Sequence, residues 1–298
     1  MTRKGIFSHK PSIKRLSFHK GLTLVELMVA LALGALVAVS IVQALISNRL
    51  SDDLNKSIAS AQENGRFIMT RLRNDLLNGA YYDPLSADLN RDVDVTEEAA
   101  FLRANFIPLP GTYASRAELG SIEGADANSD TLVIAMQGLR DCRGYKLGYD
   151  ADEEFFVVNE YFLENNSLKC RGFDGRWLRG QKGPEGHNGH ASVTLMENVL
   201  DFQVMYGITR TDVANTGGSP VRYIDASELA GALASNAYIV ALKTAVIIKG
   251  DGDGFVSEPA TFKIFEEDKK TAPDRGLYKA FQTTITLRNA NYFVRGNI

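Results

Sequence analysis

The feature that most constrains this chain is an apolar run near its start. Residues 22–46 contain one charged side chain, Glu26, and between Leu27 and Val42 the only polar residue is Ser40. As a helix rising about 1.5 Å per residue, this run is long enough to cross a hydrocarbon core of roughly 30 Å. We therefore expect a single transmembrane helix over residues 22–46.

Charge is distributed unevenly around this run. Six of the 33 Lys and Arg residues lie in residues 1–21, which contain no acidic residue. The remaining 27 basic residues face 36 acidic ones, a net charge of −9. Basic residues before a membrane helix favour a cytoplasmic N-terminus, so we expect the bulk of the chain outside the cytoplasm. An acidic body repels phosphate, and nucleic acid is therefore not an expected partner.

Two ordinary explanations of the apolar run leave Glu26 unexplained. A secretory signal peptide has an apolar core of about 7–15 residues with a small-residue cleavage site beyond it. Here the run is longer, and the small-residue junction Gly21-Leu22 comes before it. A plain signal anchor has no need of a carboxylate, whose charge costs a few kcal/mol inside a membrane. Glu26 therefore indicates a function.

The residues from Lys20 to Val29 resemble the class III signal of type IV pilins and pseudopilins. The resemblance implies that a prepilin peptidase cuts after Gly21 and that the new amine of Leu22 is methylated. It also implies that Glu26 aligns the subunit during assembly, since a buried carboxylate is tolerated when a neighbouring subunit's terminal ammonium pairs with it. Leu22 departs from the Phe or Met usual in that family, which bears on methylation and hardly on cleavage.

Beyond the membrane run, apolar residues recur at the three-, four- and seven-residue spacing of one helix face. They are Leu50, Leu54, Ile58, Ala61, Ile68, Leu72 and Leu76. No proline interrupts residues 22–78, and Asn78-Gly79 suits a helix end because glycine adopts a left-handed backbone readily. We expect one long helix over 22–79, with its second half packed under a globular head.

After this helix, short runs with strand propensity alternate with turn residues. The composition, 45% hydrophobic and 23% charged, is that of a globular protein and excludes a disordered polymer, a disulfide-dense miniprotein and a multi-span transporter. The expected strands are Thr131–Met136, Glu154–Leu163, Val193–Leu195, Leu200–Gly207, Ala237–Ile248, Thr261–Phe265 and Tyr278–Arg288. We also expect a hairpin turn at 164–167, a short helix after Asp225 and long loops at 83–130 and 171–191. The predicted fold class is α+β, with a mainly antiparallel sheet in residues 80–298 packed on the long helix.

Scattered tracts near the end of the long helix and in the head resemble PilW-type minor pilins. They are Gln62–Phe67, Ser129–Leu132, Tyr206-Gly207 and Thr283–Asn289. Together with a length near 300 residues, they favour this subfamily over a major pilin, which is usually about half as long. The resemblance implies a structural protein that takes part in type IV pilus assembly, in a priming or tip complex. Its implied partners are other minor pilins, the major pilin, the prepilin peptidase and the inner-membrane assembly platform, with the head in the periplasm or at the pilus tip.

Three other functions stay open at this stage. A type II secretion pseudopilin of the J kind shares the signal and the helix. A membrane-anchored periplasmic enzyme is disfavoured, because only His187 and His190 remain after cleavage and no Ser, His and Asp set is evident. A tip adhesin or DNA receptor would need a binding surface, for which Trp177 between Arg176 and Arg179 is the candidate, although a loop with one packed Trp is the favoured interpretation.

The remaining candidate sites are few. Cys142 and Cys170 are an even pair in an exported domain, which predicts a disulfide. His187 and His190, with Glu185 beside them, are too few ligands for a metal, and a solvated loop is the better interpretation. No cofactor is therefore expected from these residues.

Three acidic stretches resemble calcium-binding loops in part. Asp88–Asp94 and Asp126–Asp130 have carboxylate and amide oxygens but lack the glycine that the sharp turn of such a loop requires. Gly250–Gly254 has the glycines but few ligands, and a tight turn is the simpler interpretation. If calcium binds anywhere, we expect Asp251 and Asp253 to hold it.

Overall fold

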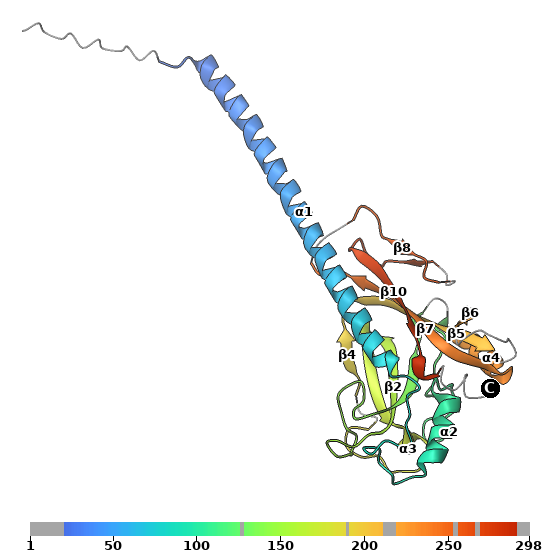
Figure 1. Ribbon diagram of the computed structural model, residues 1–298. Coiled ribbons are helices and arrows are strands. Elements are labelled where there is room, and N and C mark those ends of the chain that lie inside the picture. The colour runs from blue at the N-terminus through green and yellow to red at the C-terminus, as the bar shows by residue number, and fades with distance from the viewer. Residues whose placement is uncertain are drawn as a thin grey trace, which may run out of the picture. The chain divides into compact units, whose positions relative to one another are not determined.

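A computed structural model describes residues 21–125, 128–188, 191–210, 219–252, 256–265 and 269–290 (Figure 1). It divides into two compact units, one ending at Ser51 and the other beginning at Asp52. The predictions made for the basic leader and for Asp126, His190 and Asp253 lie outside the described residues.

Helix α1 covers Leu24–Leu77, just inside the predicted span. The residue that takes the left-handed backbone at its end is Ala80, with φ of 63°, so the expectation that Gly79 does so is wrong. Gly79 serves packing instead, because a Cβ there would lie 2.3 Å from Cδ1 of Ile134. The glycine was correctly placed near the helix end, but for a different physical reason.

The second half of α1 packs against the head through the predicted stripe. Ala61, Ile68, Leu72 and Leu76 have no exposed surface. Gly65 lets the ring of Phe281 approach, since a Cβ there would lie 2.3 Å from that ring. The amphipathic half of the helix is therefore a core element of the head.

One antiparallel sheet has the strand order β1-β2-β3-β4. Its strands are β1 (Leu132–Gly138), β2 (Phe155–Glu164), β3 (Ser167–Asp174) and β4 (Val193–Met196). The predicted hairpin turn joins β2 to β3, with Asn165 and Asn166 at positive φ. Strand β3 is not among the predicted strands, and its second half, from Arg171 on, lies in the predicted loop 171–191.

A second antiparallel sheet has the order β10-β7-β5-β6. Its strands are β5 (Val199–Arg210), β6 (Arg222–Ile224), β7 (Ala237–Lys249) and β10 (Tyr278–Thr286). A small hairpin of β8 (Thr261–Phe262) and β9 (Lys270–Thr271) pairs with neither sheet, and Phe262 packs with the cluster that contains Ala245 and Ile247 of β7. Helix α4 (Ala226–Ala234) confirms the predicted short helix, and the side chain of Asp225 caps it by accepting from the N–H groups of Ser227 and Glu228.

Two further helices lie where long loops were predicted. They are α2 (Val95–Asn105) and α3 (Gly175–Leu178). The Asp94 carboxylate caps α2 by accepting from two backbone N–H groups, and Glu97 follows it at the third position. A cap followed by an acidic residue is a helix-start signal, so α2 could have been predicted from the sequence.

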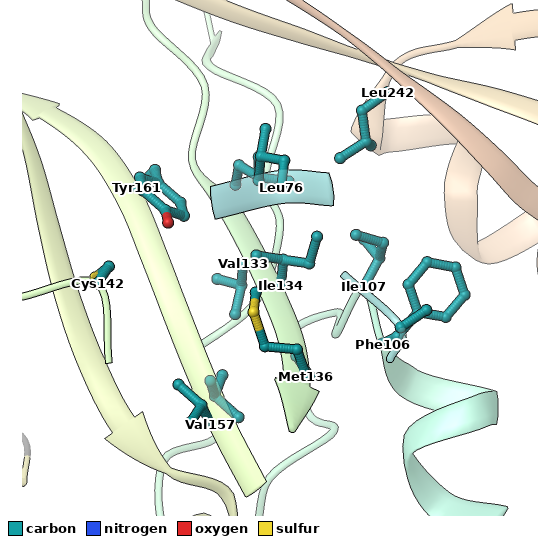
Figure 2. Packing of buried hydrophobic residues seen from close by; sticks show 14 of the residues in the cluster. Leu76, Phe106, Ile107, Val133, Ile134, Met136, Cys142, Val157, Tyr161 and Leu242 are labelled. Atoms are coloured by element: carbon teal, nitrogen blue, oxygen red, sulfur yellow. The ribbon is translucent and has the colours of Figure 1, made fainter. Parts of the chain in front are cut away.

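A single large hydrophobic cluster joins the long helix to both sheets. Figure 2 shows part of it, where Leu76 of α1 meets Ile134 of β1 and Leu242 of β7. Phe106 and Ile107, just after α2, pack beside them. The predicted α+β fold, with antiparallel sheets packed on the end of the long helix, is confirmed.

Candidate functional site

The N-terminal segment places its glutamate in the first turn of α1. Glu26 Oε2 accepts hydrogen bonds from the backbone N–H of Thr23 at 2.9 Å and from the Thr23 hydroxyl at 3.1 Å. In return the hydroxyl oxygen lies 3.3 Å from the backbone N–H of Glu26 and accepts from it. This reciprocal arrangement is a capping box, whose sequence signature is a Thr followed three residues later by a Glu. The sequence contains this signature, so Glu26 has a local role as a helix cap in addition to the role that the resemblance implies.

Capping uses only half of the acceptor capacity of Glu26. Among the described residues none donates a hydrogen bond to its second oxygen, Oε1. An ionised carboxylate accepts several hydrogen bonds, so a second donor fits without disturbing the cap. Glu26 is thus anchored in a fixed place at the helix start with one oxygen still available.

The surface that follows Glu26 is apolar and uncovered. From Leu22 to Leu50 the large hydrophobic side chains are 52–77% exposed. Among the described residues, α1 is the one helix long and apolar enough to cross a membrane. A continuous apolar surface of this size requires lipid or another protein to cover it.

The two cysteines are joined. Cys142 and Cys170 form a disulfide with their Cα atoms 6.4 Å apart, and both residues are buried. The backbone N–H of Cys142 donates to Oδ1 of Asn159 at 3.0 Å. Arg71 of α1 donates to the carbonyl oxygen of Cys142 at 2.8 Å. The disulfide therefore holds a loop that is also bonded to the packed half of the long helix.

In the histidine-containing loop, His187 and Glu185 contact other side chains of the head. The His187 ring stacks on that of Tyr145, with centroids 4.1 Å apart and planes 5° from parallel. Glu185 forms an ion pair with Lys182 at 3.4 Å. Throughout the described part of the chain, no three His, Cys, Asp or Glu residues are grouped as metal ligands would be.

The first calcium-like stretch, Asp88–Asp94, borders an open hollow of about 730 Å³ whose other wall is formed by residues 150–153. The Asn90 side-chain amide donates to the carboxylates of Asp92, at 3.0 Å, and Glu153, at 2.7 Å. These bonds use oxygens that a cation would need. Calcium binding at this stretch stays a prediction.

In the second stretch the described carboxylate has a structural role. Asp130 accepts from the backbone N–H of Gly124 at 2.9 Å and from that of Val204 in β5 at 2.7 Å. It therefore ties the loop before β1 to the second sheet.

The third stretch contacts the long helix. The Ser57 hydroxyl donates to the carbonyl oxygen of Asp251 at 2.8 Å, and the Asp251 N–H donates to the Ser60 hydroxyl at 2.6 Å. A Cβ at Gly250 would lie 2.1 Å from the carbonyl oxygen of Ser57, so only glycine fits there. The Asp251 carboxylate accepts from the side-chain amide of Asn198 at 3.1 Å. We call this contact the α1 clasp, formed by Ser57, Ser60, Gly250 and Asp251.

The proposed surface around Trp177 is not formed, because its neighbouring arginines are engaged within the head. Arg176 is 1% exposed and donates to both carboxylate oxygens of Glu98, at 2.8 and 3.0 Å. Arg179 donates to Glu97 at 2.9 Å, and Trp177 is half-buried. The candidate basic docking surface is therefore not formed, and a loop with a packed Trp, the interpretation that the sequence favoured, agrees with the structure.

Arg176 instead belongs to a buried polar network. It also donates to the carbonyl oxygen of Asn90 at 2.7 Å, and Tyr82 donates to Glu98 at 2.5 Å. Burial raises the pKa of Asp174 next to Arg176, although hydrogen bonds from the Arg176 N–H and the Tyr149 hydroxyl act in the opposite direction. A buried charge pair of this kind fixes the arrangement of loops, since losing one partner strands the other without compensation.

Comparisons with known proteins found two family models that match this chain, one in the head and one at the N-terminal segment. Residues 154–289 match the family model described as Type IV Pilus-assembly protein W. Residues 16–42 match the model of the prokaryotic N-terminal methylation motif. No curated protein matches the sequence.

Among solved structures, the chain is similar to a type IV-like pilin from Thermus thermophilus. The match has 11% sequence identity and a TM-score of 0.36, and it covers 81% of this chain and 98% of that one.

Proposed function

We propose that this chain, a type IV pilus minor pilin of the PilW type, joins other minor pilins in the priming or tip complex from which the pilus grows. The matches to the two family models support the assignment as a minor pilin. The first half of α1 anchors it in the membrane. The basic leader supports an orientation with the N-terminus in the cytoplasm and the head in the periplasm.

Processing is the first step of the proposal. A prepilin peptidase would cut between Gly21 and Leu22, releasing the amine of Leu22 for methylation. This is supported by the accessibility of the junction, because Leu22 is 77% exposed and lies before the first helical residue. Among the described residues a Cβ at Gly21 would meet nothing within 4 Å, so recognition by the peptidase, and not packing, would explain a glycine there.

Assembly rests on one observation above all: the large apolar side chains from Leu22 to Leu50 are more than half exposed. Neighbouring pilin helices would cover this surface in the filament as lipid does before assembly. The available Oε1 of Glu26 would accept from the terminal ammonium of a neighbouring subunit while Oε2 keeps the helix capped. The force for assembly would come from the inner-membrane platform and its ATPase. The major pilin would then polymerise onto the priming complex.

The main rival is a pseudopilin of type II secretion, which would use the same helix and the same glutamate. A strain lacking this chain separates the two, with surface pili and twitching motility scored beside exoprotein secretion. We expect pili to be lost and secretion to stay normal. Lost secretion with normal pili would overturn the proposal in favour of the pseudopilin.

The role of Glu26 needs a control that separates alignment from capping. Glu26→Ala should leave cleavage intact and reduce incorporation into sheared pili, because both oxygens are lost. Thr23→Val removes the hydroxyl partner but keeps the carboxylate, and it should be incorporated nearly normally. Equal loss in the two variants would show that the cap, and not the subunit contact, is what incorporation requires.

A further inference from the structure

The head closes the outer edge of one sheet with its own chain. Along the edge of β1 that does not pair with β2, Ala135 accepts a backbone hydrogen bond from Ala80 at 3.1 Å and donates one to Phe106 at 2.8 Å. Val133 exchanges hydrogen bonds with the Ser121 hydroxyl at 3.0 and 3.1 Å. Loops therefore take the place of a fifth strand along β1.

Two of the other three edges are short. Strand β4 has four residues and β6 has three. Short edge strands offer few unpaired backbone groups, which is one way in which proteins prevent unwanted strand pairing.

Strand β10 is different, because it is a long edge strand. It has nine residues and pairs with β7 without a bulge over its whole length. Just outside its ends, the carbonyl of Leu277 accepts from Gly250 at 2.8 Å and the N–H of Leu287 donates to Val240 at 2.9 Å, both toward the β7 side. Backbone groups alternate in direction along an antiparallel strand. The even-numbered residues between them therefore point their N–H and C=O groups away from β7.

These five residues are uncharged, and all of them except the half-buried Tyr278 are exposed. The exposed ones are Ala280, Gln282, Thr284 and Thr286. Among the described residues, none forms a hydrogen bond with the outward backbone groups of β10. The one charged residue of the strand, Lys279, belongs to the odd-numbered set that faces β7 with its backbone. Compared with the covered edge of β1, this long edge has no bulge, no proline and, among the described residues, no hydrogen-bonded covering segment, and Lys279 is its one charge.

We propose that the edge of β10 is a docking site for an extended, uncharged strand from the head of a different pilin subunit, which adds to this sheet. Only an extended backbone offers donors and acceptors at the spacing of the edge, which spans about 30 Å. The neutral Thr and Gln side chains call for a partner strand without charges. The inference rests on the proposed function, since it names the contact by which this subunit joins the complex.

The test uses the full-length chain in a strain that lacks its own copy. Thr284→Pro removes one outward N–H and places a ring on the edge, while the bonds to β7 remain because that N–H does not point to β7. Thr284→Ala keeps the backbone group and is the matched control. We expect Thr284→Pro to lower surface piliation at least five-fold with a normal level of processed protein, and Thr284→Ala to restore it fully. Full piliation by Thr284→Pro would overturn the proposal.

A photo-reactive residue at position 284 gives a second readout that does not depend on the proline variant folding. Illumination of intact cells should cross-link it to another pilin, while the same residue at Glu228, exposed on α4, should not react in this way. No adduct above that control, or an adduct with a second copy of this chain, would overturn the proposal. Two outcomes separate this inference from the proposed function. If the deletion strain keeps normal pili, the proposed function fails. If the deletion strain loses its pili and the Thr284→Pro chain restores them, only the inference about the β10 edge fails.

Discussion

The two halves of α1 have opposite relations to their surroundings. In the first half, up to Ser51, apolar residues occupy every face and the large ones are more than half exposed. In the second half, from Asp52 on, apolar residues occupy one stripe, and Ala61, Ile68, Leu72 and Leu76 are completely buried. The more hydrophobic half of the helix is thus the uncovered one.

This difference shows that the pattern of hydrophobic residues along a helix, and not their number, indicates which kind of partner will cover it. A one-sided stripe matches a single partner surface, which here is the chain's own head. A helix that is apolar on all sides needs a partner on all sides, and only lipid or a bundle of neighbouring helices provides one. Matched substitutions in the two halves test this comparison.

The largest effect is expected from shortening a leucine. Leu72→Ala should lower the free energy of unfolding of the head by about 2–5 kcal/mol, because it leaves a cavity in the core. Leu36→Ala, at a site 65% exposed, should leave it unchanged. Denaturant unfolding of the purified chain in detergent measures both, and equal losses would break the comparison.

The disulfide should matter only to the packed half. Replacing Cys142 and Cys170 together by Ser should cost the head about 3–4 kcal/mol, since the closed loop no longer restricts the unfolded chain. The Arg71 bond to the Cys142 carbonyl should weaken with it. Membrane insertion of the first half should be unaffected, as carbonate extraction of membranes would report. A head of unchanged stability would contradict the prediction.

Alanine substitutions at the two glycines inside α1 should have opposite effects on stability. Gly65→Ala should destabilise the head by about 1–3 kcal/mol, because the new methyl group meets the Phe281 ring. Gly34→Ala meets nothing within 4 Å and should leave the head unchanged while favouring the helix by up to about 1 kcal/mol. Thermal unfolding and helix content by circular dichroism measure the pair, and a stabilised Gly65→Ala variant would refute the packing argument.

The smallest effect concerns two serines. Ser57→Ala removes the hydroxyl that donates to Asp251 and should cost the head about 0.5–1.5 kcal/mol. Ser40→Ala removes only a bond to the carbonyl of Leu36 within the first half, and the head should not respond. Unfolding midpoints that shift equally for both would show that the α1 clasp contributes nothing.

Periodicity was enough to predict the long helix, most strands and the α+β class, because each depends on residues close together in sequence. It failed for α2, where the Asp94 cap was overlooked, and for β3, whose Lys169 and Arg171 hid the alternation. It also failed for Arg176, because its partner Glu98 lies 78 residues away and such a pair leaves no local pattern.

The candidate site divides in the same way. The processing and assembly residues Gly21, Leu22 and Glu26 stand in one short motif, so the sequence was sufficient to propose them. The edge of β10 could not be inferred, since a strand is central or peripheral only once its neighbours are known. The α1 clasp was equally hidden, because Ser57 and Asp251 are far apart in the chain.

The packed half of α1 is fastened near both of its ends, and this has a mechanical consequence. The α1 clasp holds it at Ser57 and Ser60, while the side-chain amide of Asn289 donates to the carbonyl oxygens of Leu77 and Gly79 at 3.3 and 3.2 Å. Tension along the helix axis therefore loads both fastenings and the buried stripe between them together, in shear. Contacts loaded in parallel share the force, whereas contacts peeled one after another each bear it alone, so the head is built to stay on its helix under a pull.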